Sequence, residues 1–118
     1  MSAVLSGKTA VITGASRGLG WAIAEAYGAE GASLVIGSRS AEAVADAVER
    51  LKAKGMSATG TPCDVTSPAQ IARLAEHARR TFGGFDIWIN NAGVAAPYGA
   101  TVEVDPAKFE QVVATNIL

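Results

Sequence analysis

The feature that most constrains this chain is a glycine-rich segment, residues 13–20 (TGASRGLG), which lies between an apolar run and a helical pattern. The apolar run, residues 9–12, predicts a buried strand, so the glycines fall in the turn that leads from a strand into a helix. Glycine permits positive φ and close approach of a ligand, and the first turn of a helix has unpaired N–H groups that attract an anion. The segment is therefore a candidate site for the pyrophosphate of a dinucleotide.

The spacing of this segment is G-x-x-x-G-x-G, which departs from the G-x-G-x-x-G of the general dinucleotide motif. The chain has 13 glycines in 118 residues, so such a pattern also arises by chance. An ordinary strand-to-helix turn is the alternative, and the rest of the chain must decide between the two.

Apolar periodicity predicts that strands and helices alternate along the chain. We expect strands at about residues 9–13, 33–36, 57–63 and 85–89, and helices at about residues 18–30, 41–54 and 67–82, with a last helix from residues 105–106 that continues to the end of the sequence. The first helix should bury Leu19, Ile23 and Ala26, with Trp21 exposed on the opposite side.

Helix-end residues support these boundaries. Ser40 is a predicted N-cap and Gly31 and Gly55 are predicted helix stops. Residues 67–70 (SPAQ) predict a serine cap, proline in the first turn and a glutamine that completes a capping box.

This alternation predicts an α/β fold, a doubly wound parallel sheet of the Rossmann type, with the first four strand-helix units present in a single domain over residues 1–118. Ligands of such sheets bind at the carboxyl ends of the strands. The glycine segment lies there, as do the residues that follow the other strands: Ser38 and Arg39, Asp64 and Val65, and residues 90–93 (NNAG).

Composition excludes several classes of function. The net charge of −1 and a pI near 5.7 argue against nucleic acid or an acidic membrane surface as a partner. A single cysteine, Cys63, forms no internal disulfide, and with the single His77 it makes no protein-only metal site, so both are expected to be structural. No basic leader and no membrane-length apolar run is found, which favours a cytoplasmic location.

The end of the second strand indicates which dinucleotide is preferred. NAD-specific folds place an acidic residue about 20 residues beyond the glycine motif, whereas residues 37–40 here are GSRS. The guanidinium of Arg39, with that of Arg17 from the glycine segment, can pair with a 2′-phosphate, which favours NADP(H) over NAD(H). The alternative is that both arginines are ordinary solvated surface charges.

Two motifs together resemble the short-chain dehydrogenase/reductase family: T-G-x-x-x-G-x-G at residues 13–20 and N-N-A-G at residues 90–93. Each follows a predicted strand, and the resemblance covers essentially the whole chain. Reductases of 3-oxoacyl carrier proteins and carbonyl reductases are similar in this region. The resemblance implies an oxidoreductase that transfers hydride between NADP(H) and a small-molecule carbonyl or alcohol substrate.

The resemblance also implies residue roles. Asp64 and Val65 would contact the adenine, Asn90 with the Ala92–Gly93 backbone would lie along the ribose and pyrophosphate, and Asn91 would stabilise the sheet. Asn116, expected on the last helix, matches the asparagine that holds a water of the family's proton relay and is the candidate catalytic residue. The candidate cofactor-binding residues are Gly14, Ser16, Arg17, Gly18, Leu19, Gly20, Ser38, Arg39, Asp64, Val65, Asn90, Ala92 and Gly93.

The family's catalytic tyrosine, lysine and serine have no counterpart here. Neither tyrosine begins a Y-x-x-x-K pattern, because Gly31 and Val102 stand four residues after Tyr27 and Tyr98. We therefore expect a truncated amino-terminal part of a reductase that is inactive alone. The alternative is a stand-alone nucleotide-binding or interaction module without catalysis; a methyltransferase is disfavoured by residues 90–93.

Truncation would have a consequence for assembly. We expect the fourth strand to have an unpaired edge, since the family's next strand is missing. The last helix, with Phe109, Val112 and Val113, belongs to the family's usual subunit contact, so we expect a homo-oligomer.

Overall fold

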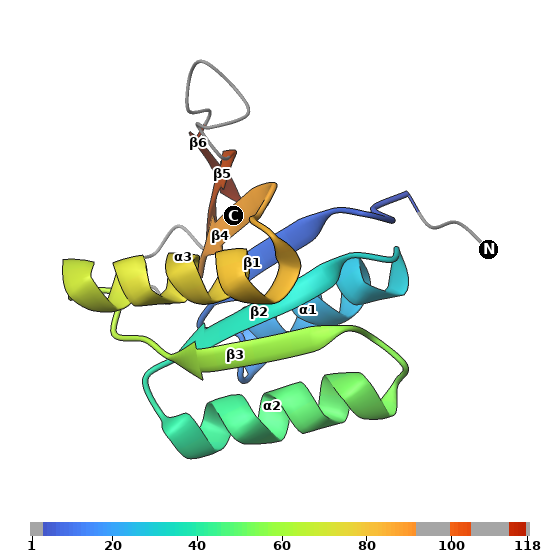
Figure 1. The fold of residues 1–118 in the computed structure, drawn as a ribbon, viewed down its shortest axis with the longest axis horizontal. Coiled ribbons are helices and arrows are strands. Elements are labelled where there is room, and N and C mark those ends of the chain that lie inside the picture. The colour runs from blue at the N-terminus through green and yellow to red at the C-terminus, as the bar shows by residue number, and fades with distance from the viewer. Residues whose placement is uncertain (1–3, 92–99, 105–113, 118) are drawn as a thin grey trace.

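The computed structural model describes residues 4–91, together with the backbone of residues 100–104 and 114–117. Its centre is a six-stranded sheet in the order β3-β2-β1-β4-β5-β6 (Figure 1). The strands are β1 (Thr9–Thr13), β2 (Ser33–Ser38), β3 (Ala58–Pro62), β4 (Ile87–Asn90), β5 (Ala100–Val104) and β6 (Ala114–Ile117). The helices are α1 (Gly18–Ala29), α2 (Ala41–Ala53) and α3 (Pro68–Phe82).

The first four strands are parallel and alternate with the three helices, which confirms the predicted doubly wound α/β architecture. β1 lies in the middle, with Val11 paired to Val35 of β2 on one side and to Trp88 of β4 on the other. The carboxyl ends of these strands therefore meet at one edge of the sheet, where the candidate site residues were expected.

The core has one layer on each face of the sheet, because successive residues of a strand point to opposite faces. One layer contains side chains of α1 and α2, and these two helices lie on the same side of the sheet (Figure 1). The other contains side chains of α3. The first includes Ile12, Ile36, Ala24, Leu51 and Ile89, and the second includes Val11, Val35, Leu74, Phe85 and Trp88.

The buried face of α1 differs from the prediction. Gly20 and Ala24 are its buried residues, and Ile23 is partly buried against the core as predicted, whereas Leu19 is 46% exposed and Ala26 is exposed. Gly20 sets this orientation, since only a residue without a side chain can lie as close to Gly14 and Asn91 as it does. Leu19 is rotated about 100° away from it around the helix. Trp21 was predicted to be exposed, but it is partly buried and packs against the core.

The region after β4 also differs from the prediction. Residues 114–117, expected in a helix, form β6, which pairs antiparallel with β5, and β5 pairs antiparallel with β4. The edge of β4 is therefore occupied, not open as expected. Threonine, valine and isoleucine are frequent in these two strands, and their branched side chains favour extended backbone. The expected helix start at residues 105–106 and the three apolar residues of its contact face lie outside the described residues.

None of the helices in the described part of the chain has the length and apolar character needed to cross a membrane.

Candidate cofactor-binding site

The start of α1 differs chemically from the starts of the other two helices. Its N-cap residue is Arg17, in extended backbone, and no side chain caps the helix or adds an acid to the first turn. In α2 and α3, by contrast, Ser40 and Ser67 accept hydrogen bonds from the N–H groups of Ala43 and Gln70, as predicted. The first turn of α1 thus has donors that no side chain occupies, next to the glycine turn.

Glycine is required in this turn for two different reasons. Gly14 and Gly18 have φ values of 62° and 64°, which disfavour other residues. Gly20 is needed for close approach, because a Cβ there would lie 2.2 Å from the carbonyl oxygen of Gly14 and 2.6 Å from Nδ2 of Asn91. The turn is therefore packed directly against the end of β1 and the residue that follows β4.

Asn91 fixes the glycine turn to β4. Its backbone N–H donates to Oγ1 of Thr13 at 3.0 Å, and its Nδ2 donates to the carbonyl oxygen of Gly14 at 3.2 Å. The Thr13 hydroxyl in turn donates to the carbonyl oxygen of Ile89 at 3.4 Å. Thr13 was predicted only as part of the glycine motif, and its bridging of β1 and β4 was not foreseen from the sequence.

The end of β2 approaches the glycine turn. The hydroxyls of Ser16 and Ser38 are 3.2 Å apart, and the N–H of Ala15 donates to the carbonyl oxygen of Gly37 at 3.4 Å. The next residue, Arg39, is exposed. Two hydroxyls and a guanidinium at one strand end are groups that bind a phosphate.

The end of β3 adds a carboxylate. Cys63 donates its N–H to the carbonyl oxygen of Ser38 at 2.7 Å, which keeps Asp64 beside the end of β2. Oδ1 of Asp64 accepts from the hydroxyl and the backbone N–H of Thr66, and these bonds, helped by the positive charge of Arg39, lower the pKa of Asp64. Asp64 is therefore an ionised acceptor at neutral pH.

The predicted capping box forms only in part. Gln70 does donate its N–H to Ser67, but its Oε1 accepts from the N–H of Asp64 at 2.8 Å. This contact connects the loop after β3 to α3. Glutamine three residues after a cap usually returns to the cap itself, so the contact with Asp64 could not be foreseen from the sequence.

Asn90, the last residue of β4, is held by the side chain of Trp88, which belongs to neither motif. Its Oδ1 accepts from Nε1 of Trp88 at 2.8 Å. Residues two apart in a strand lie on the same face, so this spacing could have indicated the pair.

The remaining predicted site residues are placed as follows. Leu19 lies beside the glycine turn and Val65 follows Asp64, whereas Ala92 and Gly93 lie outside the described residues. Asn116 is in β6, paired with Thr101 of β5, so its expected helical placement is wrong.

Cys63 and His77 have structural surroundings. Burial raises the pKa of the Cys63 thiol, and the charge of Asp64 adds to the effect, which disfavours a reactive thiolate. His77 of α3 bonds through Nε2 to the hydroxyl of Thr59 at 2.8 Å. Within the described residues, no group of three or more His, Cys, Asp or Glu side chains could hold a metal ion.

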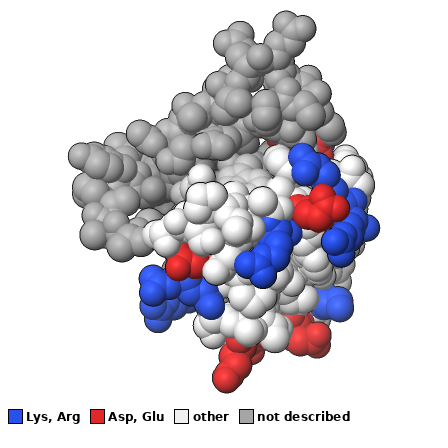
Figure 2. Space-filling model, turned by 60° about the vertical axis from the view of Figure 1, so that its left-hand side comes forward, with Lys and Arg blue, Asp and Glu red and all other residues white. Residues whose placement is uncertain are grey.

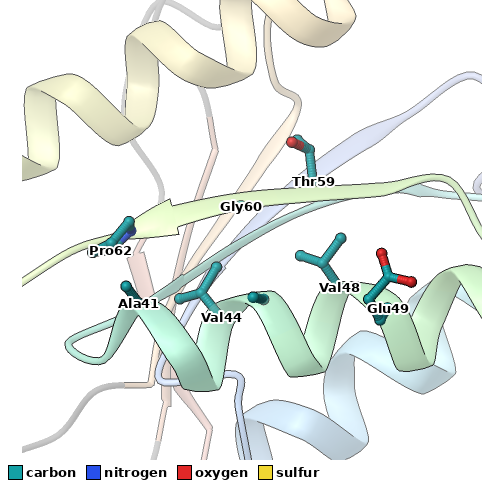
Figure 3. A pocket seen from close by; sticks show the side chains of 8 residues that line it. Ala41, Val44, Val48, Glu49, Thr59, Gly60 and Pro62 are labelled. Atoms are coloured by element: carbon teal, nitrogen blue, oxygen red, sulfur yellow. The ribbon is translucent and has the colours of Figure 1, made fainter.

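A separate apolar groove lies between α2 and β3 (Figure 3). Val44 and Val48 line it from the helix, Gly60 and Pro62 line it from the strand, and Glu49 is its one ionisable lining group. None of the candidate cofactor-binding residues lines this groove. Elsewhere on the surface, Figure 2 shows a face on which basic and acidic side chains are interspersed.

Comparison with known proteins agrees with this geometry. Residues 8–118 match the model of the short chain dehydrogenase family. Versicolorin reductase 1 of Aspergillus parasiticus is 41% identical over 113 residues, which are 95% of this chain and 43% of that protein. The chain thus spans less than half the length of this relative.

Solved structures give the same result. L-Sorbose reductase from Gluconobacter frateurii, complexed with NADPH and L-sorbose, is 41% identical with a TM-score of 0.76 over 81% of this chain and 37% of that one. A short chain dehydrogenase/reductase from Burkholderia phymatum, in complex with NAD, is 39% identical with a TM-score of 0.67 over 70% of this chain and 29% of that one. The chain belongs to the short-chain dehydrogenase family of oxidoreductases, which have a Rossmann nucleotide-binding fold.

Proposed function

We propose that this chain is the NADP(H)-binding part of an oxidoreductase that transfers hydride between NADP(H) and a carbonyl or alcohol substrate. The observation that carries the proposal is the meeting of the uncapped start of α1 with the Ser16–Ser38 hydroxyl pair and Arg39. The bound cofactor supplies or accepts the hydride, and the residues of this chain bind and orient it.

The glycine turn holds the pyrophosphate in this proposal. Gly14, Gly18 and Gly20 keep side chains away from the first-turn N–H groups of α1, which donate to the phosphate oxygens. The hydroxyls of Ser16 and Ser38 and the guanidinium of Arg39 bind the 2′-phosphate, with Arg17 as a second cation. No acid stands at residues 37–40 to repel that phosphate.

The neighbouring strand ends bind the rest of the dinucleotide. Asp64 accepts from the adenine amino group through the carboxylate oxygen that Thr66 does not occupy. Asn90 lies along the ribose. The roles of Leu19, Val65, Ala92, Gly93 and Asn116 stay as predicted from the family resemblance.

Titration of the purified chain with NADPH and NADH tests the proposal. We expect NADPH to bind at least about tenfold more tightly, because a charge-assisted contact to the 2′-phosphate contributes roughly 1.5–3 kcal/mol. Equal or tighter binding of NADH would contradict the NADP preference, and no binding of either would contradict the proposed function as a whole.

A second candidate is a nucleotide-binding module without catalysis. It is favoured by one observation, that no tyrosine in the 118 residues precedes a lysine by four positions. Loss of a general acid typically costs 100- to 10,000-fold in rate, so we expect no measurable NADPH oxidation by these residues with ketones or quinones. Appreciable turnover would refute the expected inactivity.

We propose further that residues 1–118 are a single partial domain of a cytoplasmic protein that forms homo-oligomers. The reduced, buried thiol of Cys63 suits a reducing compartment. Sedimentation as a clean monomer would count against self-association.

A further inference from the structure

We propose that Trp88 is a positioning residue for the cofactor, because its indole N–H fixes the orientation of the Asn90 carboxamide at the end of β4. This inference rests on the proposed function, in which Asn90 contacts the ribose. It assigns a role to a side chain that lies outside both glycine and asparagine motifs.

The indole is held rigidly by its own packing. Trp88 is 7% exposed, on the α3 face of the sheet, and its ring meets that of Phe85 edge to face at a centroid distance of 5.3 Å. Phe85 in turn lies under the guanidinium of Arg79. A side chain packed in this way has little rotational freedom, so the direction of its N–H is determined before any ligand binds.

The chemistry of the indole determines which end of the amide faces it. An indole nitrogen is a donor only, so it can meet the oxygen of a carboxamide and not the NH₂ group. Oδ1 of Asn90 accepts that N–H at 2.8 Å. Within the described part of the chain, Nδ2 of Asn90 has no hydrogen-bond partner. The Trp88 bond therefore leaves two N–H donors available.

The position of Asn90 gives these donors a use. Its neighbour Ile89 is paired with Ile12, so Asn90 is level with Thr13, the first residue of the glycine segment. A ribose carries hydroxyl oxygens and a pyrophosphate carries anionic oxygens, all of which accept hydrogen bonds. Without Trp88, the amide could rotate and present its oxygen to them, which would be repulsive toward a phosphate.

A double-mutant cycle in NADPH affinity tests this role. We expect Trp88→Phe to weaken NADPH binding about 3- to 10-fold and Asn90→Ala to weaken it about tenfold, the range of one hydrogen bond. If Trp88 acts through Asn90, Trp88→Phe in the Asn90→Ala background should weaken binding by less than about twofold. Trp21→Phe is the matched control, since Trp21 contacts Arg50 from α1, and it should leave the affinity unchanged.

Nuclear magnetic resonance provides a second test, the change in the indole N–H chemical shift of Trp88 on NADPH binding, which a purely structural role of Trp88 would not produce. The chain has two tryptophans, so its spectrum has two indole N–H peaks, and NADPH should shift that of Trp88 and not that of Trp21. In Asn90→Ala this shift should disappear. If Trp88→Phe does not fold, the wild-type and Asn90→Ala spectra decide the matter.

The outcomes separate this inference from the proposed function. Normal NADPH binding by the wild type with unchanged affinity in Trp88→Phe, or additive effects in the double variant, would overturn the role of Trp88 alone. An unshifted Trp88 peak at saturating NADPH would do the same. No NADPH binding by the wild type would overturn the proposed function, and this inference with it.

Discussion

The starts of α1 and α3 follow parallel strands of the same sheet, yet they use their backbone donors in opposite ways. At α3, Ser67 occupies the N–H of Gln70, and the Gln70 side chain occupies the N–H of Asp64. At α1, no side chain accepts from the first turn. A capped helix start satisfies its donors inside the protein, whereas an uncapped one retains them for a ligand. This difference is the reason why, in the proposed function, the phosphate binds at the end of β1 and not at the end of β3.

The largest effect is expected where the uncapped turn is packed most tightly. Gly20→Ala should lower the free energy of unfolding by about 3 kcal/mol, because the new Cβ would collide with the carbonyl of Gly14 and the amide of Asn91. Urea denaturation measures the change. The control is Gly55→Ala, at φ +83° in open space, where only backbone strain of about 1–2 kcal/mol applies. Equal losses in the two variants would show that close approach is not what Gly20 provides.

The next effect concerns the 2′-phosphate, which in the proposed function binds beside the uncapped start of α1, at the end of β2. Arg39→Ala should weaken NADPH binding about 10- to 100-fold, the range for a hydrogen bond to a charged group, and change NADH binding less than twofold. Calorimetric titration with both cofactors measures it. Arg80→Ala, on α3 beside Glu76, is the control and should affect neither. A parallel loss for NADH would assign Arg39 to general affinity and not to the 2′-phosphate.

The two helix starts also show how far sequence can predict this molecule. The capped starts of α2 and α3 were foreseen because a cap is a local signature, readable within four residues. Which face of α1 is buried was not foreseen. Periodicity counts Leu19 as a core residue and gives no weight to Gly20, which matters here because it has no side chain. β6 was missed because its pairing with β5 joins residues 11 to 17 positions apart, which the periodicity of a short segment does not reveal.

The candidate site divides along the same line. Residues 13–20 and 90–93 carry recognisable motifs and were found from their spacing, their place after predicted strands and the family resemblance. The bonds that hold them in place were not. Thr13 to Ile89, Trp88 to Asn90 and Gln70 to Asp64 each depend on side-chain direction in the folded chain, which no motif contains. Sequence thus indicated the groups proposed to face the ligand, and the structure adds the side chains that hold them in place.

A smaller effect is expected from converting one kind of helix start into the other. Arg17→Ser and Arg17→Ala both remove the guanidinium, but serine at the N-cap can accept from the first turn, so Arg17→Ser should be more stable by about 1 kcal/mol. Arg17→Ser should also bind NADPH more weakly than Arg17→Ala, because the cap competes with phosphate for the same donors.

The converse change at α3, Ser67→Ala, should lower the free energy of unfolding by about 1 kcal/mol and leave NADPH binding unchanged. Denaturation and titration of the three variants measure both quantities, and identical binding by the two Arg17 variants would contradict the competition.

The smallest effect concerns the carboxylate of Asp64, in the loop between β3 and the start of α3. Hydrogen bonds from Thr66 lower the pKa of Asp64 below its ordinary value of 3.8, so ionised Asp64 contributes stability above that value, and this contribution is lost as the pH falls through the lower, folded pKa. Thr66→Val removes the hydroxyl donor and keeps the backbone N–H, so the pKa of Asp64 should rise part of the way back. A pH titration of the Asp64 carboxyl carbon by nuclear magnetic resonance measures the shift. Thr81→Val, at an exposed position near the end of α3, is the control. An unchanged Asp64 pKa in Thr66→Val would mean that the backbone bond and Arg39, and not the hydroxyl, keep the carboxylate ionised.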